Sequence, residues 1–367
     1  MTKQVNNQTK RKTLFVFMVG TTAELIRVAP ILIELKKRNQ KYKIILSGQN
    51  NVRVKEVEKY TGQLETTLLI NKSTKPSVFR FGIWAVKAFI LGLDILHKEK
   101  MQARKNINLI IYGDPVTTTI GAIIAKILHI KIIHIESGDL SKNLKEPFPE
   151  EICRNINIRL ADVLFPPSTW ATNNLKNIHK PKINTHFNTL LEGFNWYKKQ
   201  TIQKNVIPKQ KYYILILHRQ EHVIFRKNWS KKIIKTVIDN SEKKLVCVLF
   251  NHPITVKIIK SLDMENKNIK IMPLINYSTF IKLMEKAEYI ATDGATNQFE
   301  AYLMGKPCLL LREHTEQIEG LNENVVLSKG DTGIINDFLT DYKKRRRKPV
   351  KTNIKPSEII VNYLLKN

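Results

Sequence analysis

The sequence predicts an α/β protein with two Rossmann-like domains, whose parallel sheets face a central cleft. Short apolar runs, such as 14–19 and 109–112, alternate with longer amphipathic segments, such as 23–37. Runs this apolar are typical of strands buried on both faces, and strand–helix alternation with short connections gives parallel sheets. The length of 367 residues exceeds what one ordinary core holds, so we expect two domains.

The strand–helix pattern occurs twice along the chain. The first series of expected strands covers 14–19, 43–46, 109–112, 131–135 and 163–165, and the second covers 212–217, 245–250, 268–272, 289–292 and 308–311. Polar residues at 177–184 separate the two series. We therefore predict an N-terminal domain at 1–183, a C-terminal Rossmann-like domain at 184–350, and a C-terminal helix at 351–367.

The composition fits a globular protein of a reducing compartment. The hydrophobic content is 43%, and the polar N-terminus runs directly into a strand without a secretory apolar segment. The three cysteines, Cys153, Cys247 and Cys308, lack the spacing of metal ligands, and two of them lie in apolar strand-like runs. We expect a cytoplasmic protein with reduced, buried thiols and no metal site.

The net charge of +29 brings three kinds of partner into consideration: nucleic acid, an anionic membrane surface and an anionic substrate. No zinc finger or aromatic RNA-binding motif is present in the sequence, which argues against nucleic acid. The densest basic run, 342–351, is interpreted as a solvated linker, the usual role of a charge run. The alternative is peripheral docking to an anionic membrane through this run and the segment 79–96.

The segment 79–96 is apolar enough to suggest membrane insertion. Arg80, Lys87 and Asp94, however, recur every seven residues and therefore lie along one helical stripe. This pattern predicts a broad-faced amphipathic helix that belongs to a domain and does not span a membrane.

Acidic residues follow two of the expected buried strands. Asp114 and Glu136 each come directly after an apolar run. Ligands of open parallel sheets bind outside the carboxyl ends of the strands, so both carboxylates should face the cleft. Glu150 begins the next expected helix, with Arg154 one turn further on. Such a set of carboxylates and a cation suits proton transfer on a neutral substrate. Glu150 alone has a second explanation, because a negative charge in the first turn stabilises a helix.

Polar residues also follow strands of the second series. His218 and Arg219 end the first of these strands, and Arg312 follows the last. A turn of small residues leads from another strand into a helix that contains Glu300, and it consists of Gly294, Ala295 and Thr296. Backbone amides at such a turn can approach a phosphate, and Glu300 could bridge ribose hydroxyls. We expect nucleotide binding here. The alternatives are that His218 only forms hydrogen bonds within the protein, and that the turn at 294–296 serves only to pack the helix against the sheet.

Motifs in both halves occur in the order and at the spacing of one enzyme family. They are Gly20-Thr21-Thr22-Ala23-Glu24, Gly48-Gln49, Gly113-Asp114, His134-Ile135-Glu136, Pro147-Phe148-Pro149-Glu150-Glu151 with Arg154, His218-Arg219, Asp293 with Gln298 and Glu300, and Thr315-Glu316 with Glu319. On these residues the chain resembles the non-hydrolysing UDP-N-acetylglucosamine 2-epimerases over nearly its whole length. The resemblance implies the twin-Rossmann, GT-B-like architecture, a C-terminal helix that crosses back to the first domain, and a homodimer.

The resemblance also implies a reaction. UDP leaves as the C2 proton is removed, which gives a 2-acetamidoglucal, and UDP then re-adds as a proton reaches the opposite face of the sugar. The acid/base candidates that it implies are Asp114, Glu136 and Glu150. It further implies that Arg154 and His218 hold the sugar and the diphosphate, and that Glu300 holds the ribose of a UDP-sugar. No metal and no redox cofactor are implied.

The nucleotide-binding motifs depart from the family pattern mainly by the loss of arginines. Thr22, Gln220 and Gln317 stand where the family has arginine, and Gly294 replaces a hydroxyl donor, whereas Arg27 replaces the usual lysine and keeps its charge. We expect an epimerase that interconverts UDP-GlcNAc and UDP-ManNAc, or a close analogue, for surface polysaccharide synthesis. The alternative is a GT-B glycosyltransferase that extends a lipid-linked or capsular glycan at the cytoplasmic membrane face. A non-catalytic sensor of nucleotide sugars would leave the retained acids unexplained.

Overall fold

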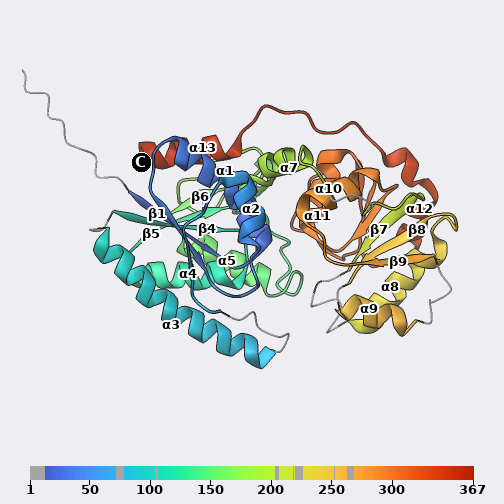
Figure 1. Ribbon diagram of the computed structural model, residues 1–367, viewed down its shortest axis with the longest axis horizontal. Helices are drawn as coiled ribbons and strands as arrows, with labels where there is room; N and C mark the ends of the chain where they lie inside the picture. Colours follow the sequence, from blue (N-terminus) through green and yellow to red (C-terminus); the bar gives the residue numbers. More distant parts are fainter. Residues whose placement is uncertain are drawn as a thin grey trace, which may run out of the picture. The chain divides into compact units, whose positions relative to one another are not determined.

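The computed structural model describes residues 13–71, 78–103, 106–202, 206–217, 219, 226–251, 253–262 and 268–367. These residues form two compact units, coloured along the chain in Figure 1. Unit 1 comprises the chain up to Gly138, Ile152–Leu190 and Lys355–Asn367. Unit 2 comprises Asp139–Glu151 and Leu191–Ile354. Both units have helices around a parallel sheet, so the predicted α/β class with two Rossmann-like domains is confirmed.

The sheet of unit 1 has six parallel strands in the order β3-β2-β1-β4-β5-β6. The strands are β1 (Leu14–Val19), β2 (Tyr42–Leu46), β3 (Thr66–Leu68), β4 (Ile107–Tyr112), β5 (Lys131–Ile135) and β6 (Val163–Phe165). In the register, Phe17 of β1 lies between Ile44 of β2 and Ile110 of β4. The strand order reverses between β1 and β4, and the carboxyl ends of strands at such a reversal are where open sheets bind ligands.

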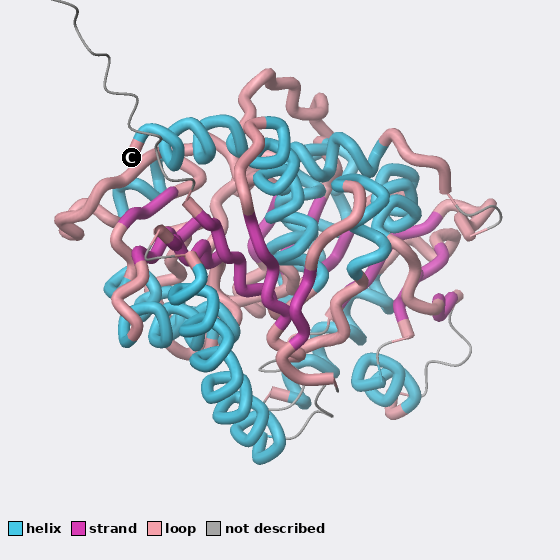
Figure 2. The backbone as a smooth tube through the Cα atoms, turned by 60° about the vertical axis from the view of Figure 1, so that its left-hand side comes forward, coloured by secondary structure: helices cyan, strands magenta, loops and turns pink. Residues whose placement is uncertain are grey.

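Helices enclose this sheet, as the cyan and magenta tube of Figure 2 shows. They are α1 (Thr22–Lys37), α2 (Val54–Thr61), α3 (Val78–Gln102), α4 (Val116–Ile127), α5 (Glu150–Leu160), α6 (Thr169–Asn174) and the terminal α13 (Pro356–Lys366). Helix α13 packs against α1, and the ring of Tyr363 lies 5.5 Å from that of Phe165. The last residues of the chain therefore complete the unit that contains its first strand.

The sheet of unit 2 repeats the same topology in the order β12-β11-β10-β7-β8-β9. Its strands are β7 (Tyr212–Ile216), β8 (Val246–Phe250), β9 (Ile269–Met272), β10 (Ile290–Thr292), β11 (Cys308–Leu310) and β12 (Val325–Leu327). Its helices are α7 (Leu190–Lys198), α8 (Lys227–Asn240), α9 (Pro253–Lys260), α10 (Tyr277–Lys286), α11 (Ala295–Met304) and α12 (Thr332–Asp341), followed by the 3-10 turn Tyr342–Arg345. The reversal here lies between β7 and β10.

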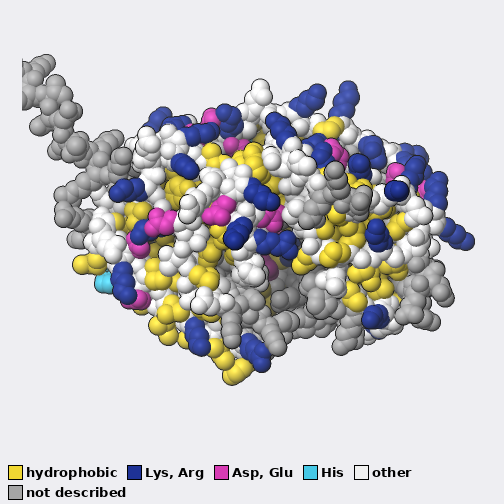
Figure 3. Space-filling view, viewed as in Figure 1, with side chains coloured by type: hydrophobic (Ala, Val, Ile, Leu, Met, Phe, Trp, Pro, Cys, Tyr) yellow, Lys and Arg dark blue, Asp and Glu magenta, His cyan; other side chains and the backbone are white. Residues whose placement is uncertain are grey.

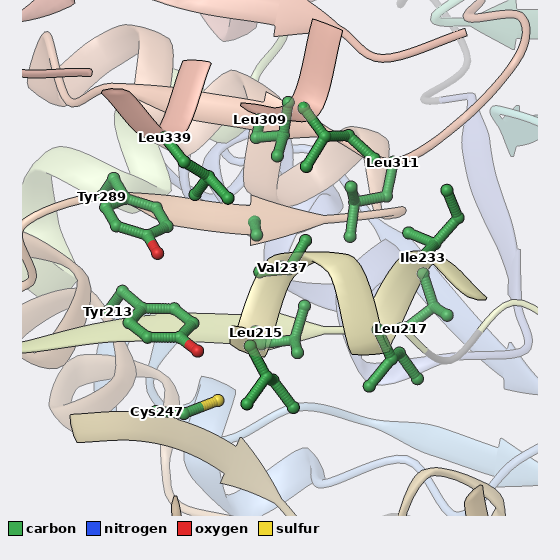
Figure 4. Close-up of a cluster of buried hydrophobic side chains, with 14 of the residues drawn as sticks. Tyr213, Leu215, Leu217, Ile233, Val237, Cys247, Tyr289, Leu309, Leu311 and Leu339 are labelled. Carbon is green, nitrogen blue, oxygen red and sulfur yellow. The ribbon is translucent and has the colours of Figure 1, made fainter. Parts of the chain in front are cut away.

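An aromatic stack anchors one core of unit 2, which Figure 4 shows. The rings of Tyr213 and Tyr289 are 4.8 Å apart and nearly parallel. Leu215, Leu309 and Val237 fill the layer beside them, and all are buried. The hydroxyl of Tyr289 lies 2.6 Å from that of Ser241, so a polar atom within this core has a partner. Adjacent strands of the second series are thereby fixed in register.

Helix α3 shows the amphipathic pattern in a modified form. Trp84, Ala88 and Leu96 are buried, four or eight residues apart. The opposite face is not simply polar, because Phe79 and Val86 are 78% and 61% exposed. Among the described residues, no helix is long and apolar enough to cross a membrane.

The basic run 342–351 is not the solvated linker that we expected. The guanidinium of Arg347 lies 4.4 Å from the ring centre of Tyr302 and donates hydrogen bonds to the Asn324 side chain and the Tyr302 carbonyl. Its backbone N–H donates to the Gly305 carbonyl at 3.0 Å. A β-carbon at Gly305 would lie 2.1 Å from the Arg347 carbonyl oxygen, so the close approach requires glycine. The run is docked on unit 2 because its arginine has acceptors and an aromatic face there.

Candidate active site

The carboxyl edge of the unit 1 sheet carries Asp114 after β4 and Glu136 after β5. Gly113 turns the chain with φ of +63°, and Glu136 itself adopts φ of +61°. A left-handed backbone is uncommon outside glycine and costs free energy, and such residues concentrate at functional sites. The geometry thus places two carboxylates at the edge that the sequence predicted, one of them on a strained backbone.

Each of these carboxylates lies against an arginine. The Nη1 group of Arg27, from α1, donates to both oxygens of Glu136 at 2.9 and 2.8 Å. Arg154, from α5, donates to Asp114 in a second close ion pair. The side chains of Arg27 and Glu136 are 14% and 13% exposed, so solvent screens this pair only partly. The structure therefore brings together four of the predicted residues as two compensated charge pairs.

A buried tyrosine helps to hold the first pair. The Tyr112 hydroxyl donates to Asn188 at 2.8 Å and lies 2.9 Å from the Thr189 hydroxyl. Thr189 in turn donates to the Arg27 carbonyl at 2.6 Å. The arginine is thus fixed through its backbone as well as through its guanidinium.

The turn that carries Asp114 is held by His134 and Asn157. The Nε2–H group of His134 and the amide of Asn157 donate to the Gly113 carbonyl at 2.9 and 3.3 Å. Burial lowers the pKa of His134 to about 4, so the ring is neutral at physiological pH. Asn157 was not among the predicted residues. Its position three residues after Arg154 on α5 is the sequence signal that could have indicated it.

The segment 139–151 carries two buried acids, Glu146 and Glu151. Glu151 belongs to the motif that ends at this residue but was given no role of its own, and Glu146 was not singled out from the sequence. Glu151 accepts hydrogen bonds from the backbone N–H groups of Ser141 and Lys142 at 3.1 and 3.0 Å, so it closes the segment on itself. Glu146 accepts from the backbone N–H of Glu313 at 3.1 Å. Glu150 is the first residue of α5 and is half-buried. It begins the helix that was expected there, four residues before Arg154.

Arg219 and Arg312 of unit 2 share one carboxylate. The backbone N–H of Arg219 donates to Asp293 at 2.9 Å, and its guanidinium lies 3.4 Å from Glu316. Arg312 is fully buried and lies 2.7 Å from the other oxygen of Glu316. The structure therefore places Arg312 inside the unit, whereas Arg219 stands at the carboxyl end of β7. His218 lies outside the described residues.

The turn from β10 into α11 has the predicted form. Gly294 caps α11 without a side chain, and Ala295 and Thr296 form the first turn of the helix. Glu300 is fully buried, and its two oxygens accept from the Tyr277 hydroxyl at 2.6 Å and the Asn297 amide at 3.0 Å. Tyr277 was not predicted, because nothing in its local sequence distinguishes it from a packing aromatic.

The residues that the structure describes contain no cluster of histidine, cysteine and acidic side chains arranged to hold a metal ion. Cys153, Cys247 and Cys308 are buried and free. Burial raises the pKa of the Cys247 thiol to about 12, so this sulfur stays protonated and unreactive.

Two units, each with a parallel sheet and surrounding helices, define a twin-Rossmann α/β protein, and comparison with known proteins shows the family of the chain. A family model described as UDP-N-acetylglucosamine 2-epimerase matches residues 85–354. Because this match covers more than half of the sequence, the chain belongs to the UDP-N-acetylglucosamine 2-epimerase family. The predicted family resemblance is thereby confirmed, and relatives named UDP-N-acetylglucosamine 2-epimerase are isomerases.

Individual relatives agree with this assignment. The UDP-N-acetylglucosamine 2-epimerase of Methanocaldococcus jannaschii is 29% identical over 332 residues, which cover 86% of this chain and 87% of the relative. The crystal structure of that organism's UDP-GlcNAc 2-epimerase in complex with UDP-GlcNAc and UDP is similar with a TM-score of 0.78 and 26% identity, covering 96% of this chain and all of that one. The UDP-2,3-diacetamido-2,3-dideoxy-D-glucuronate 2-epimerase of Pseudomonas aeruginosa is 29% identical over 231 residues, 62% of this chain and 63% of the relative.

The buried histidine predicts how stability depends on pH. Because the pKa of His134 falls from 6.5 to about 4 on folding, the unfolded chain binds more protons between these values. The free energy of unfolding should therefore fall as the pH drops from 6.5 to 4, with about 3 kcal/mol of this loss due to His134. We expect His134→Gln to show a correspondingly shallower loss in urea titrations. His97→Gln, at an exposed position of α3, should keep the parent slope, and an unchanged slope in His134→Gln would contradict the assignment.

Proposed function

We propose that the protein inverts C2 of a UDP-N-acetylhexosamine, such as UDP-GlcNAc to UDP-ManNAc or a close analogue, by elimination and re-addition of UDP. The observation that carries the proposal is the pair of arginine-compensated carboxylates, Asp114 and Glu136, at neighbouring strand ends in a chain of this family. The family match does not favour the glycosyltransferase alternative, so we do not propose glycosyl transfer.

The chemistry needs acid/base groups that reach both faces of C2. One carboxylate removes the C2 proton while the C1–O bond to UDP breaks, and a second group returns a proton to the other face as that bond re-forms. We assign these proton transfers to Asp114, Glu136 and Glu150. Arg154 orients Asp114 through their ion pair. We assign stabilisation of the departing diphosphate to His218, whose protonated ring would carry a positive charge.

The charge balance at the unit 1 edge bears on which sugar is bound. The relative from Pseudomonas aeruginosa is named for a substrate with a uronate carboxylate. A uronate requires a cation in its binding site, whereas Arg27 and Arg154 each already lie against a carboxylate of this chain. This balance favours a neutral N-acetylhexosamine.

We assign the nucleotide to unit 2. The first turn of α11, at Gly294, Ala295 and Thr296, offers backbone amides to a phosphate, and Arg219 adds positive charge. Glu300 is assigned to the ribose together with Tyr277, whose hydroxyl already bonds to it. Arg312 acts through Glu316, because its guanidinium is buried against that carboxylate.

We further propose a cytoplasmic enzyme that supplies an activated sugar for surface polysaccharide. The three buried, free thiols support a reducing compartment. A UDP-N-acetylhexosamine is the kind of activated donor that such synthesis consumes.

Proton NMR in deuterated water tests the reaction directly. Purified protein incubated with UDP-GlcNAc should exchange the C2 proton for deuterium and produce a second set of sugar signals. Incubation with UDP-ManNAc should give the same final mixture of UDP-GlcNAc and UDP-ManNAc, because an epimerase brings both sugars to one equilibrium. If neither these sugars nor related UDP-sugars exchange the C2 proton, the proposed function is wrong.

Glu150→Gln separates a proton-transfer role from a helix-start role. Gln keeps the shape of the side chain but cannot exchange a proton, so we expect turnover to fall by about 10²–10⁴ with nucleotide binding nearly unchanged. A helix-start role would change stability by only about 0.3–1 kcal/mol and leave turnover intact. The neighbouring Glu151→Gln is the control. It should lower the melting temperature, because Glu151 closes the 139–151 segment, with turnover within a few-fold of the parent.

We propose that the exposed apolar face of α3 binds a second copy of the chain. Phe79, Val86 and Ile90 lie on this face, 78%, 61% and 59% exposed, and Figure 3 shows apolar side chains and cations side by side along α3. Arg80 and Asp94 stand seven residues to either side of Lys87. Two α3 helices crossing antiparallel at Lys87 would bring Arg80 of each copy near Asp94 of the other.

Ile90→Glu should therefore convert a dimer into a monomer, since it places a hydrated carboxylate within the apolar contact that the two helices would share. The measurement is light scattering coupled to gel filtration. Leu274→Glu, at a position of unit 2 that is 67% exposed, should leave the dimer intact. A parent protein that is monomeric, or one that floats with acidic liposomes in a salt-sensitive manner, would contradict the assignment of this face to a second copy.

A further inference from the structure

Residues 139–151 carry Glu150, one of the acids assigned to proton transfer, yet this segment does not belong to the unit that contains the rest of α5. It groups with unit 2, and the chain returns to unit 1 at Ile152, within the first turn of the helix. The position of Glu150 therefore depends on what holds the segment to unit 2.

The segment buries acids while its large apolar side chains stay in solvent. Between residues 141 and 151 the buried side chains are those of Glu146, Pro147 and Glu151. Leu144 and Phe148 are 59% and 45% exposed, so their burial does not hold the segment in place. Glu151 accepts from backbone N–H groups of the same segment and gives it a closed shape. Glu146, by contrast, reaches other parts of unit 2.

Glu146 is 4% exposed and contacts three residues of unit 2. Its oxygen Oε1 accepts from the backbone N–H of Glu313 at 3.1 Å and lies 3.9 Å from Nε of Arg312. Its oxygen Oε2 lies 4.0 Å from Nη1 of Arg226, which precedes α8. One directed hydrogen bond and two positive charges from separate parts of the unit thus fix the carboxylate.

Both arginines have a closer carboxylate than that of Glu146. Arg226 lies 2.6 Å from Glu313, and Arg312 lies 2.7 Å from Glu316. Loss of the Glu146 carboxylate would therefore leave both guanidinium groups compensated, and their charge does not explain why an acid stands at position 146. What this acid adds is direction, because a hydrogen bond fixes an orientation that non-directional apolar contact does not.

We propose that Glu146 is a positioning residue for the epimerisation, because it anchors the segment that places Glu150 for proton transfer at C2. The inference rests on the proposed function. Glu146 lies four residues before Glu150, and Glu151 closes the same segment directly after it. A shift at Glu146 therefore moves the carboxyl group of Glu150. A misplacement of about 1 Å at a catalytic group can lower the rate about 100-fold.

The test compares turnover with nucleotide affinity in Glu146→Ala. We expect kcat for C2 exchange to fall by about 100-fold, because the segment loses its anchor. The Kd for UDP, measured by calorimetry, should stay within about threefold of the parent, because Arg219 and the first turn of α11 are unchanged. Glu146→Gln keeps an acceptor for the Glu313 N–H but carries no charge. Its kcat should lie between those of the alanine variant and the parent, and it replaces the alanine variant if that one does not fold.

Combination with Glu150→Gln identifies the group through which Glu146 acts. If Glu146 only positions Glu150, adding Glu146→Ala to Glu150→Gln should lower kcat by no more than about twofold further. A full second loss of about 100-fold would show that Glu146 acts independently of Glu150, and it would overturn the inference. An unchanged kcat in Glu146→Ala alone, or a loss of UDP binding equal to the loss of turnover, would overturn it as well.

A control variant and a measurement without substrate complete the test. Glu242→Gln removes another acid of unit 2, which precedes β8 and bonds to Lys343, and it should lower the melting temperature with kcat unchanged. Amide hydrogen exchange of residues 139–151 should become faster in Glu146→Ala and stay as in the parent in Glu242→Gln. Unchanged protection of this segment in Glu146→Ala would overturn the anchoring role alone. A parent protein without C2 exchange would overturn the proposed function instead.

Discussion

The site depends on charge compensation at the carboxyl edge of one parallel sheet. Two carboxylates stand there on turns that are partly withdrawn from water, and each has a guanidinium within ion-pair distance. Removing one partner of such a pair leaves an uncompensated charge, which costs about 3–5 kcal/mol where the pair is buried. The arginines come from two helices, α1 and α5. The packing of both helices on the sheet therefore brings the positive charges that stabilise the two partly buried carboxylates.

Uncharged hydrogen-bond donors surround these ion pairs. They fix the orientation of the paired residues without adding charge. His134 and Asn157 both donate to the Gly113 carbonyl, and Thr189 donates to the Arg27 carbonyl. Side chains locked in this way hold their geometry without reorganising when charge moves, which is how preorganised sites lower barriers. Asp114 and Arg27 are thus oriented through hydrogen bonds to backbone carbonyls of their own segments.

The sequence indicated the strand ends well, because the last residue of an apolar run marks where a buried strand stops. Asp114, Glu136 and the helix start at Glu150 were found in this way. Asn157 and Tyr277 were missed, because their partners are remote in the chain and only folding reveals them. Arg312 was expected at the nucleotide because it follows a strand, but its side chain is buried against Glu316. The position of a residue after a strand does not indicate whether its side chain points into the unit or toward a ligand. The short edge strands β3 and β12 carry too few residues to show a period.

The path of the chain has a consequence for how the molecule can be divided. Residues 139–151 leave β5 of unit 1, belong to unit 2, and return into α5. Glu146 of that segment lies 3.9 Å from the buried Arg312. Unit 1, conversely, is completed only by the last residues, which come after the whole of unit 2. No single cut of the gene can therefore separate the two units, and a chimaera made by one crossover between relatives would always join mismatched parts within unit 1.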